Sequence, residues 1–239
     1  MYIQKVLSNG IRVVAEHVPY VQSVSLGVWV ANGSRCEKKS ENGISHFIEH
    51  MLFKGTQSRS AEQIALEMDS VGGQLNAFTT RECTCFYAKT LNDYAPKAMD
   101  ILSDMIFCPA LSERDMDLER RVVMEEIAMY EDSPEDVVYD LFARTVWGDT
   151  PMGRAILGTA EALGDITPDS MRRYIKEHYT SKSIVIAVSG NFGDDLFDKL
   201  DRYFGRRDIN DNAVEFEKAS YSPAKAIDKR DFEQVQLVA

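Results

Sequence analysis

Two histidines and a glutamate stand together in one short segment, His46-Phe47-Ile48-Glu49-His50. On an α-helix with about 3.6 residues per turn, His46 and His50 lie one turn apart on the same face, and Glu49 lies beside them. Neutral imidazole is a common zinc ligand, and a catalytic zinc keeps one position open for a water molecule that a nearby carboxylate can activate. This H-x-x-E-H segment therefore predicts a catalytic zinc site.

The sequence around the motif favours a helix that presents it. Asn42-Gly43 is a helix start signal, and Gly55 stands where a glycine in the left-handed conformation often ends a helix. The apolar residues that recur at helical spacing are Ile44, Phe47, Ile48, Met51 and Leu52. We expect this apolar face to anchor the helix while the histidines face a cleft.

A third ligand is needed, because the motif alone arises by chance in on the order of one chain per hundred of this size, and zinc in hydrolases commonly has three protein ligands. Glu119, Glu125 and Glu126 form an acidic cluster about seventy residues after the motif. Glu119 and Glu126 are two helical turns apart on one face, whereas Glu125 is turned by about 100° from Glu126. One carboxylate can bind the metal while another supports a ligand, and the spacing leaves both Glu125 and Glu126 open as the ligand. Without the histidines, this run of glutamate and arginine is more typical of a solvated helix face.

Four segments resemble motifs of the pitrilysin and insulysin metallopeptidases, which carry an inverted zinc motif of the H-x-x-E-H type. The closest resemblance is to the branch of the mitochondrial processing peptidases and their bacterial relatives. The segments are residues 46–56, 72–79, 119–126 and 151–158. They occur in the family's order and at its approximate spacing, and the likeness extends from the first strand to about residue 205. Arg154 lies in the last segment, and neither its type nor its position assigns it a role.

The resemblance implies roles for residues of the first and third segments. His46, His50 and Glu126 would bind one zinc ion per chain. Glu49 would be the general base, which takes a proton from the attacking water and passes it to the leaving amine. Glu119 would orient a histidine ligand. Two neutral imidazoles and one carboxylate leave the ion with a net positive charge, so that it can acidify water and polarise a peptide carbonyl.

Residues 72–90 predict two strands, or one strand with a bend, after the paired glycines Gly72-Gly73. By the resemblance, Asn76, Ala77 and Phe78 lie on a strand at the edge of the cleft, where an extended substrate adds as a further strand. Backbone pairing of this kind binds peptides with little demand on their sequence. Without the resemblance, Asn76 is more simply explained as the cap of a turn.

Turn and capping signals predict an α+β fold, in which a layer of helices packs on a largely antiparallel mixed sheet. A hairpin is predicted at Ser8-Asn9-Gly10, and helices are predicted to start at Ser60, Ser112, Ser133 and Thr167. Further strands are expected at residues 24–30 and 183–189, and further helices at residues 94–107 and 194–203. The resemblance implies the same two-layer architecture, that of one metallopeptidase half of the processing-peptidase type.

Composition sets further limits. The chain has 239 residues, 44% of them apolar, which suffices for a substantial core, and it carries a net charge of −11. The absence of a basic stripe and of a glycine-rich phosphate loop argues against nucleic-acid and nucleotide partners. No apolar run reaches the length of a membrane span and no apolar leader precedes the first strand, so we expect no membrane partner and a cytoplasmic location. The 4 cysteines show no zinc-type pairs and are expected to be reduced thiols.

Composition also suggests how the chain is divided. Residues 1–205 are expected to form the zinc-binding peptidase domain, residues 206–230 a polar linker, and residues 231–239 the start of a second, truncated half. Members of the family usually carry two such halves, of which the second lacks the metal and closes the cleft. An uncovered cleft face favours a homodimer or pairing with a second-half partner chain.

Two functions are consistent with these observations. The first is a zinc-dependent endopeptidase that hydrolyses extended peptides or unfolded protein segments with metal-activated water. The alternative is a zinc-bearing peptide-binding or pairing module, inactive until a second half or a partner chain closes the cleft. Glu49 favours the first function, because a binding module needs no general base beside its metal, whereas the truncated second half favours the alternative.

Overall fold

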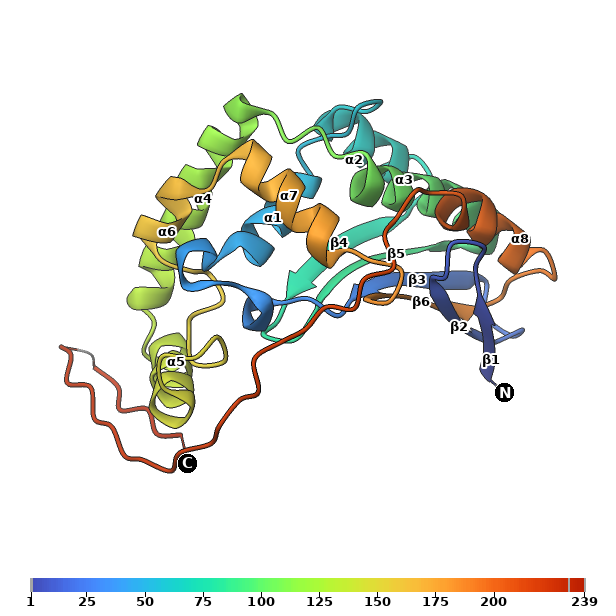
Figure 1. Ribbon diagram of the computed structural model, residues 1–239. Coiled ribbons are helices and arrows are strands. Elements are labelled where there is room, and N and C mark those ends of the chain that lie inside the picture. Colours follow the sequence, from blue (N-terminus) through green and yellow to red (C-terminus); the bar gives the residue numbers. More distant parts are fainter. Residues whose placement is uncertain (1, 232, 239) are drawn as a thin grey trace.

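The computed structural model describes residues 2–231 and 233–238 of the chain. A six-stranded sheet with the strand order β1-β2-β6-β3-β5-β4 forms one layer, and helices cover one of its faces (Figure 1). Among these residues, four of the five strand pairings are antiparallel, and β2 and β6 run parallel. The strands are β1 Tyr2–Val6, β2 Arg12–His17, β3 Ser23–Val30, β4 Gln74–Thr79, β5 Thr84–Leu91 and β6 Ile184–Gly190. The predicted α+β fold with a largely antiparallel mixed sheet is confirmed.

The helical layer packs on the sheet mainly through α1 and α3. The helices are α1 Ile44–Leu52, α2 Ala61–Asp69, α3 Ala95–Phe107, α4 Glu113–Glu131, α5 Pro134–Trp147, α6 Ala160–Asp165, α7 Pro168–His178 and α8 Leu196–Leu200. Short helical turns also lie at Ser34–Cys36, Lys39–Glu41, Asn92–Tyr94 and Asp201–Gly205. Within the described residues, no helix combines the length and the apolar character needed to cross a membrane.

Burial alternates along the strands and shows which face of the sheet is covered. In β3, Val24, Leu26, Val28 and Val30 are buried against the helices, whereas Ser25 and Trp29 point to the other face and are exposed. All five apolar residues predicted for one face of α1 are fully buried. The prediction that this face anchors the helix is therefore confirmed.

Most of the local signals form the structures predicted from them. Ser60 caps α2 and forms a reciprocal capping box with Gln63. Ser112, Ser133 and Thr167 each accept a hydrogen bond from the backbone N–H three residues further on.

Two helical segments differ from the prediction. Helix α6 was not predicted, because its 6 residues are too few to show a helical period, although Thr159 caps it as a threonine commonly does. The helix predicted at residues 194–203 is instead α8 followed by a π-helical turn at Asp201–Gly205.

The β1–β2 hairpin turns at Ser8-Asn9-Gly10, as predicted. Gly10 has a φ of +93°, a conformation that glycine adopts without the strain of a side chain. The Asn9 side chain donates hydrogen bonds to the backbone oxygens of Phe204 and Arg207. The N-terminal hairpin is thereby joined to the end of the helical region.

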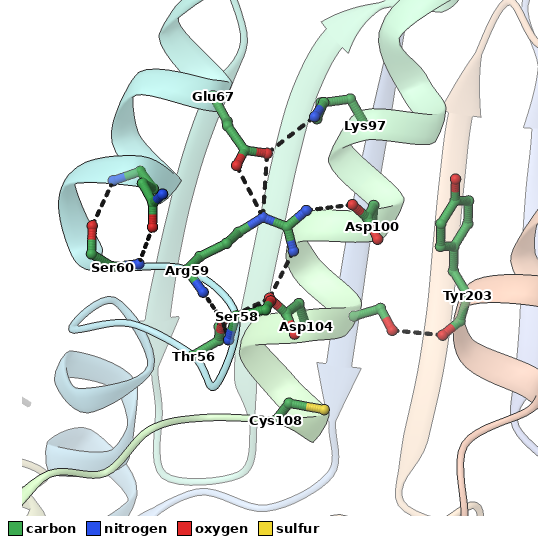
Figure 2. Close-up of polar contacts among 12 residues, drawn as sticks. Thr56, Ser58, Arg59, Ser60, Glu67, Lys97, Asp100, Asp104, Cys108 and Tyr203 are labelled. Carbon is green, nitrogen blue, oxygen red and sulfur yellow. Dashed lines mark hydrogen bonds and ion pairs between the residues drawn. The ribbon is translucent and has the colours of Figure 1, made fainter.

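Arg59 anchors the loop that follows α1 to helix α3. Figure 2 shows its guanidinium among three carboxylates, with Nη1 2.7 Å from Asp104 Oδ2, Nη2 2.5 Å from Asp100 Oδ2 and Nε 3.2 Å from Glu67 Oε2. The Thr56 hydroxyl also donates to Asp104, at 2.7 Å. The loop between α1 and α2 is therefore tied to α3, and this fixes the path of the chain as it leaves α1.

Residues 206–231 and 233–238 contain neither helix nor strand. This segment passes beside α5 (Figure 1), where the rings of Tyr221 and Trp147 lie 6.0 Å apart and the Ser222 N–H donates to the Val146 oxygen. Within residues 231–239, which are predicted to begin a second half, residues 233–238 pair with no strand among the described residues, and residues 232 and 239 lie outside those residues. The division into residues 1–205, 206–230 and 231–239 stays a prediction.

Candidate metal centre

Helix α1, which carries the H-x-x-E-H segment, begins at a buried carboxylate. Gly43 stands at the N-terminal cap and has no side chain to accept the free N–H groups of the first turn. Glu37 supplies the acceptor, since its Oε1 accepts from the Ser45 N–H at 2.9 Å and its Oε2 from the Gly43 N–H at 2.8 Å. Its charge stands at the positive end of the helix dipole, and burial raises the pKa of Glu37 to about 6. Sequence analysis did not assign this role to Glu37, because a helix cap supplied by a side chain 6 residues before the N-cap has no recurring sequence pattern.

The segment of residues 151–158 packs against the same end of α1. Arg154 Nη2 donates a hydrogen bond to the backbone oxygen of Glu37 at 2.8 Å. A Cβ at Gly43 would stand 2.6 Å from the Leu157 oxygen, so glycine permits this close approach. Arg154 therefore supports the start of α1, a place that sequence analysis did not assign.

Helices α1 and α4 bring His46, His50 and Glu126 together. Glu126 Oε2 lies 3.7 Å from His46 Nε2 and 3.5 Å from His50 Nε2. One ligand atom from each side chain lies within 4.8 Å of the other two, and this is the one group of three or more such side chains found in the part of the chain that the structure describes. Ligand atoms at about 2.1 Å from a tetrahedral zinc ion stand about 3.4 Å apart. The three side chains therefore fit a zinc ion.

Glu126, and not Glu125, is the carboxylate of this group. Glu125 is exposed to solvent and lies outside the group. Helical spacing left both residues open, because the choice depends on how α4 is rotated against α1. That Glu126 binds the metal stays a prediction.

Burial and the neighbouring carboxylate set the protonation of the two histidines. Burial lowers the pKa of His46 to about 4, with a smaller contribution from His50, so the His46 ring is neutral near pH 7. Hydrogen bonding to Glu126 raises the pKa of His50, against the effect of burial, and the same contact lowers the pKa of Glu126. The group thus holds a neutral imidazole and a carboxylate side by side, which are donor types that zinc accepts.

Glu119 contacts the His50 ring on the side opposite to Glu126. Its Oε2 is 3.1 Å from His50 Nδ1, and the residue is buried. Because a carboxylate accepts hydrogen bonds and donates none, His50 Nδ1 carries a proton in this contact, and Nε2 is the ring nitrogen that faces Glu126. This contact has the geometry expected of a residue that orients a histidine ligand.

Glu49 extends from α1 towards β4. Its Oε2 accepts a hydrogen bond from Thr79 Oγ1 at 2.5 Å, and burial raises the pKa of Glu49. Thr79 reaches Glu49 because Leu75, Ala77 and Thr79 are the residues of β4 that point towards the helical layer. Sequence analysis missed this role, although strand alternation within residues 72–79 is a signal that could have placed Thr79 on the covered face.

The three residues predicted to bind substrate lie on β4. Within the described residues this strand pairs with β5 and with no other strand, so it forms an edge of the sheet. The Ala77 N–H donates to Asn76 Oδ1 at 2.8 Å and therefore points towards the free edge. Asn76 lies within the strand and is not the cap of a turn. Phe78 lies on the uncovered face, where its ring centroid is 5.5 Å from that of Trp29.

A cavity of about 850 Å³ lies elsewhere, between α4, α5, the loop of residues 148–159 and α6. Its lining includes Tyr130 and Asp140 but none of the H-x-x-E-H residues. The side chains of His50 and Glu126 are 22% and 32% exposed. The group of His46, His50 and Glu126 is therefore accessible directly from solvent, without passage through this cavity.

Two family models match successive parts of the chain. Residues 12–160 match the model described as Insulinase (Peptidase family M16), and residues 165–237 match the one described as Peptidase M16 inactive domain. The second match includes β6, which lies between β2 and β3 in the sheet. The boundary between the two matches therefore does not separate two folded units.

Curated bacterial relatives are similar over nearly the whole chain. The uncharacterized zinc protease YmxG of Bacillus subtilis is 44% identical over 229 residues, which are 96% of this chain and 56% of that protein. An uncharacterized zinc protease of Mycobacterium leprae is 41% identical over 238 residues, which are 97% of this chain and 54% of that protein. The chain thus spans about half the length of the curated relatives that it matches.

Solved structures share the architecture. The crystal structure of a protease from Helicobacter pylori superposes with a TM-score of 0.85 at 23% identity, over 93% of this chain and 54% of that one. The peptidase M16 inactive domain from Pseudomonas fluorescens superposes with the same TM-score at 14% identity, over 92% of this chain and 54% of that one. At such identities the likeness shows the fold.

Proposed function

Because the chain belongs to the insulinase family of peptidases, family M16, we propose that it is the metal-bearing part of a zinc metalloendopeptidase. The observation that carries this proposal is the convergence of His46 Nε2, His50 Nε2 and Glu126 Oε2. Two imidazoles and one carboxylate are a ligand set of catalytic zinc, and three protein ligands leave one position open for chemistry. The relatives named as zinc proteases support the same activity.

In this proposal, residues of α1 and α4 bind the metal, transfer the proton and orient a ligand. His46, His50 and Glu126 hold the zinc ion, which would acidify water and polarise a peptide carbonyl. Glu49 takes a proton from the attacking water and passes it to the leaving amine. Burial raises the pKa of Glu49, and this favours a carboxyl group that both accepts and releases a proton. Glu119 keeps the Nε2 lone pair of His50 turned towards the metal position.

The substrate in this proposal is an extended peptide or an unfolded protein segment that adds to β4. The free edge of β4 offers backbone groups that a further strand can pair with, and the Ala77 N–H is available once the Asn76 side chain turns away. Thr79 of the same strand contacts Glu49. A peptide at this edge therefore runs beside the proposed base.

Hydrolysis of a quenched, basic, extended peptide tests the proposal. The 239-residue chain with one equivalent of zinc would be compared with its Glu49→Gln variant. We expect cleavage by the parent chain and, in the variant, full zinc retention with a loss of hydrolysis of several orders of magnitude, because the variant lacks the base but no ligand. Loss of zinc from Glu49→Gln, or equal cleavage by both proteins, would show that the assigned roles are wrong.

A second function is favoured by the family model that residues 165–237 match. That model is described as Peptidase M16 inactive domain, and the matches to the two relatives described above cover 54–56% of those proteins. The alternative is therefore a zinc-bearing module that binds peptides, or pairs with a second copy or a second-half chain, and cleaves only when the cleft is closed. Zinc binding without cleavage in the experiment above would favour this alternative, and cleavage restored by a second-half chain would establish it.

A further inference from the structure

The ammonium group of Lys54 lies beside the carboxylate that contacts His50. Lys54 Nζ is 2.6 Å from Glu119 Oε1, and the other oxygen of the same carboxylate, Oε2, is 3.1 Å from His50 Nδ1. The Glu119 side chain is 8% exposed and that of Lys54 is 36% exposed. Ammonium, carboxylate and imidazole thus form a row that ends on a proposed zinc ligand.

The backbone on both sides of Lys54 is fixed. Its own N–H donates to the Met51 oxygen at 3.1 Å, which continues the last turn of α1. Beyond it, the loop is tied to α3 through Thr56 and Arg59, as Figure 2 shows. The Lys54 side chain therefore starts from a fixed point at the end of α1 and reaches across to α4.

We propose that Lys54 is a positioning residue of the zinc site. Its ammonium group holds Oε1 of Glu119 and so fixes the rotation of the carboxylate that aims Oε2 at His50 Nδ1. Through Glu119, Lys54 selects the His50 tautomer and ring orientation in which Nε2 faces the metal position. This inference rests on the proposed zinc site.

An electrostatic role and a positioning role of Lys54 predict opposite changes in zinc affinity when this residue is replaced. A positive charge near the metal position repels a divalent cation, so a purely electrostatic effect would make zinc bind more tightly after the lysine is removed. A positioning effect would make zinc bind more weakly, because Glu119 would lose the partner that holds its orientation. Removing a residue that hydrogen-bonds to a metal ligand typically weakens metal binding by about 10–100-fold. Lys54 contacts such a residue and not the ligand itself, so we expect its removal to weaken zinc binding by about tenfold.

Zinc affinity, measured by competition with a chromophoric chelator at fixed pH, tests the proposal. Lys54→Met removes the charge and keeps much of the side-chain volume, whereas Lys54→Arg keeps a cationic donor. We expect a Kd about tenfold higher for Lys54→Met and a Kd close to the parent value for Lys54→Arg. An unchanged or lower Kd in Lys54→Met would overturn the proposal, and Lys54→Gln provides the same test if Lys54→Met does not fold.

Lys97→Met is the matched control, because Lys97 is also a half-buried lysine paired with a glutamate, at 3.0 Å from Glu67 Oε2. Thermal unfolding of the zinc-free proteins would report the stability lost with each ion pair. We expect both variants to lose stability and only Lys54→Met to lose zinc affinity, and an equal loss of affinity in Lys97→Met would overturn a specific role for Lys54. A parent chain that binds no zinc would overturn the proposed function, whereas a parent and a Lys54→Met variant that bind zinc equally would overturn only the role of Lys54.

Discussion

The Thr79 hydroxyl, on the edge strand β4, donates a hydrogen bond to the Glu49 carboxylate of α1 at 2.5 Å. This contact joins the strand proposed to receive substrate to the residue proposed to act as the base. It is made possible by strand alternation, which turns Thr79 towards the helical layer while Asn76 and Phe78 point to the other face. The position of the carboxylate therefore depends on the packing of α1 against β4.

Thr79→Val is expected to slow peptide hydrolysis without weakening zinc binding. Valine has the shape of threonine but cannot donate to Glu49. A hydrogen bond to a charged group is worth roughly 1.5–3 kcal/mol, so kcat should fall by about 10–100-fold while KM changes little. The measurement is kcat and KM in whichever form cleaves the test peptide, the chain alone or the chain with a second half. Thr79→Ser retains the hydroxyl and should restore kcat, and an unchanged kcat in Thr79→Val would remove Thr79 from the machinery.

Glu126→Gln and Glu125→Gln form a matched pair that tests the third ligand. Both remove one negative charge from the same turn of α4, but only Glu126 approaches the two histidines. We expect Glu126→Gln to weaken zinc binding by more than about a hundredfold, the upper end for residues that only orient a ligand. Glu125→Gln should bind zinc as the parent chain does. Equal losses in the two variants, measured by chelator competition, would mean that net charge and not ligation is responsible.

Glu37→Gln is expected to change how stability depends on pH. Burial raises the pKa of Glu37 from 4.5 to about 6, so between these values the folded chain holds a proton that the unfolded chain releases. The contribution of Glu37 to stability is therefore complete below about pH 4.5 and is lost as the pH rises through about 6. The free energy of unfolding of Glu37→Gln, relative to the parent, should rise by about 2 kcal/mol between about pH 4 and pH 7. Urea unfolding of the zinc-free proteins measures it, and a difference that does not vary with pH would contradict it.

Arg59→Met is expected to destabilise the fold by about 3–5 kcal/mol, because it leaves a cluster of carboxylates without the cation that joins them. The Arg59 side chain is 15% exposed and contacts Asp104, Asp100 and Glu67 (Figure 2). Arg59→Lys should recover only part of the loss, since an ammonium group lacks the planar fork that serves several carboxylates at once. Urea unfolding at pH 7 measures both variants. Equal stability of Arg59→Lys and the parent would mean that charge alone is sufficient.

The sequence predicted the features that depend on a few neighbouring residues. The capping box of Ser60 and Gln63 and the turn at Gly10 form as expected, because their hydrogen bonds join residues close in sequence. The resemblance to known motifs also selected His46, His50 and Glu126 as the expected zinc ligands.

The contacts that hold this group were not predictable in the same way. Glu37, Lys54 and Thr79 each act on a residue of another element, so their roles depend on how helices and strands pack together. The choice between Glu125 and Glu126 likewise depends on the rotation of α4. Only the folded arrangement decides such questions, because hydrophobic pattern and propensity carry no information about the angle at which two elements meet.

The central place of β6 has a consequence for the nascent chain. Strand β6 pairs with β2 on one side and β3 on the other, although both partners are synthesised much earlier. Until Gly190 has left the ribosome, the hairpin of β1 and β2 and the group of β3, β5 and β4 each present an unpaired edge, which is the kind of surface that favours aggregation. Folding of the six-stranded sheet described here, and with it the support of α1, therefore waits for β6 to be translated.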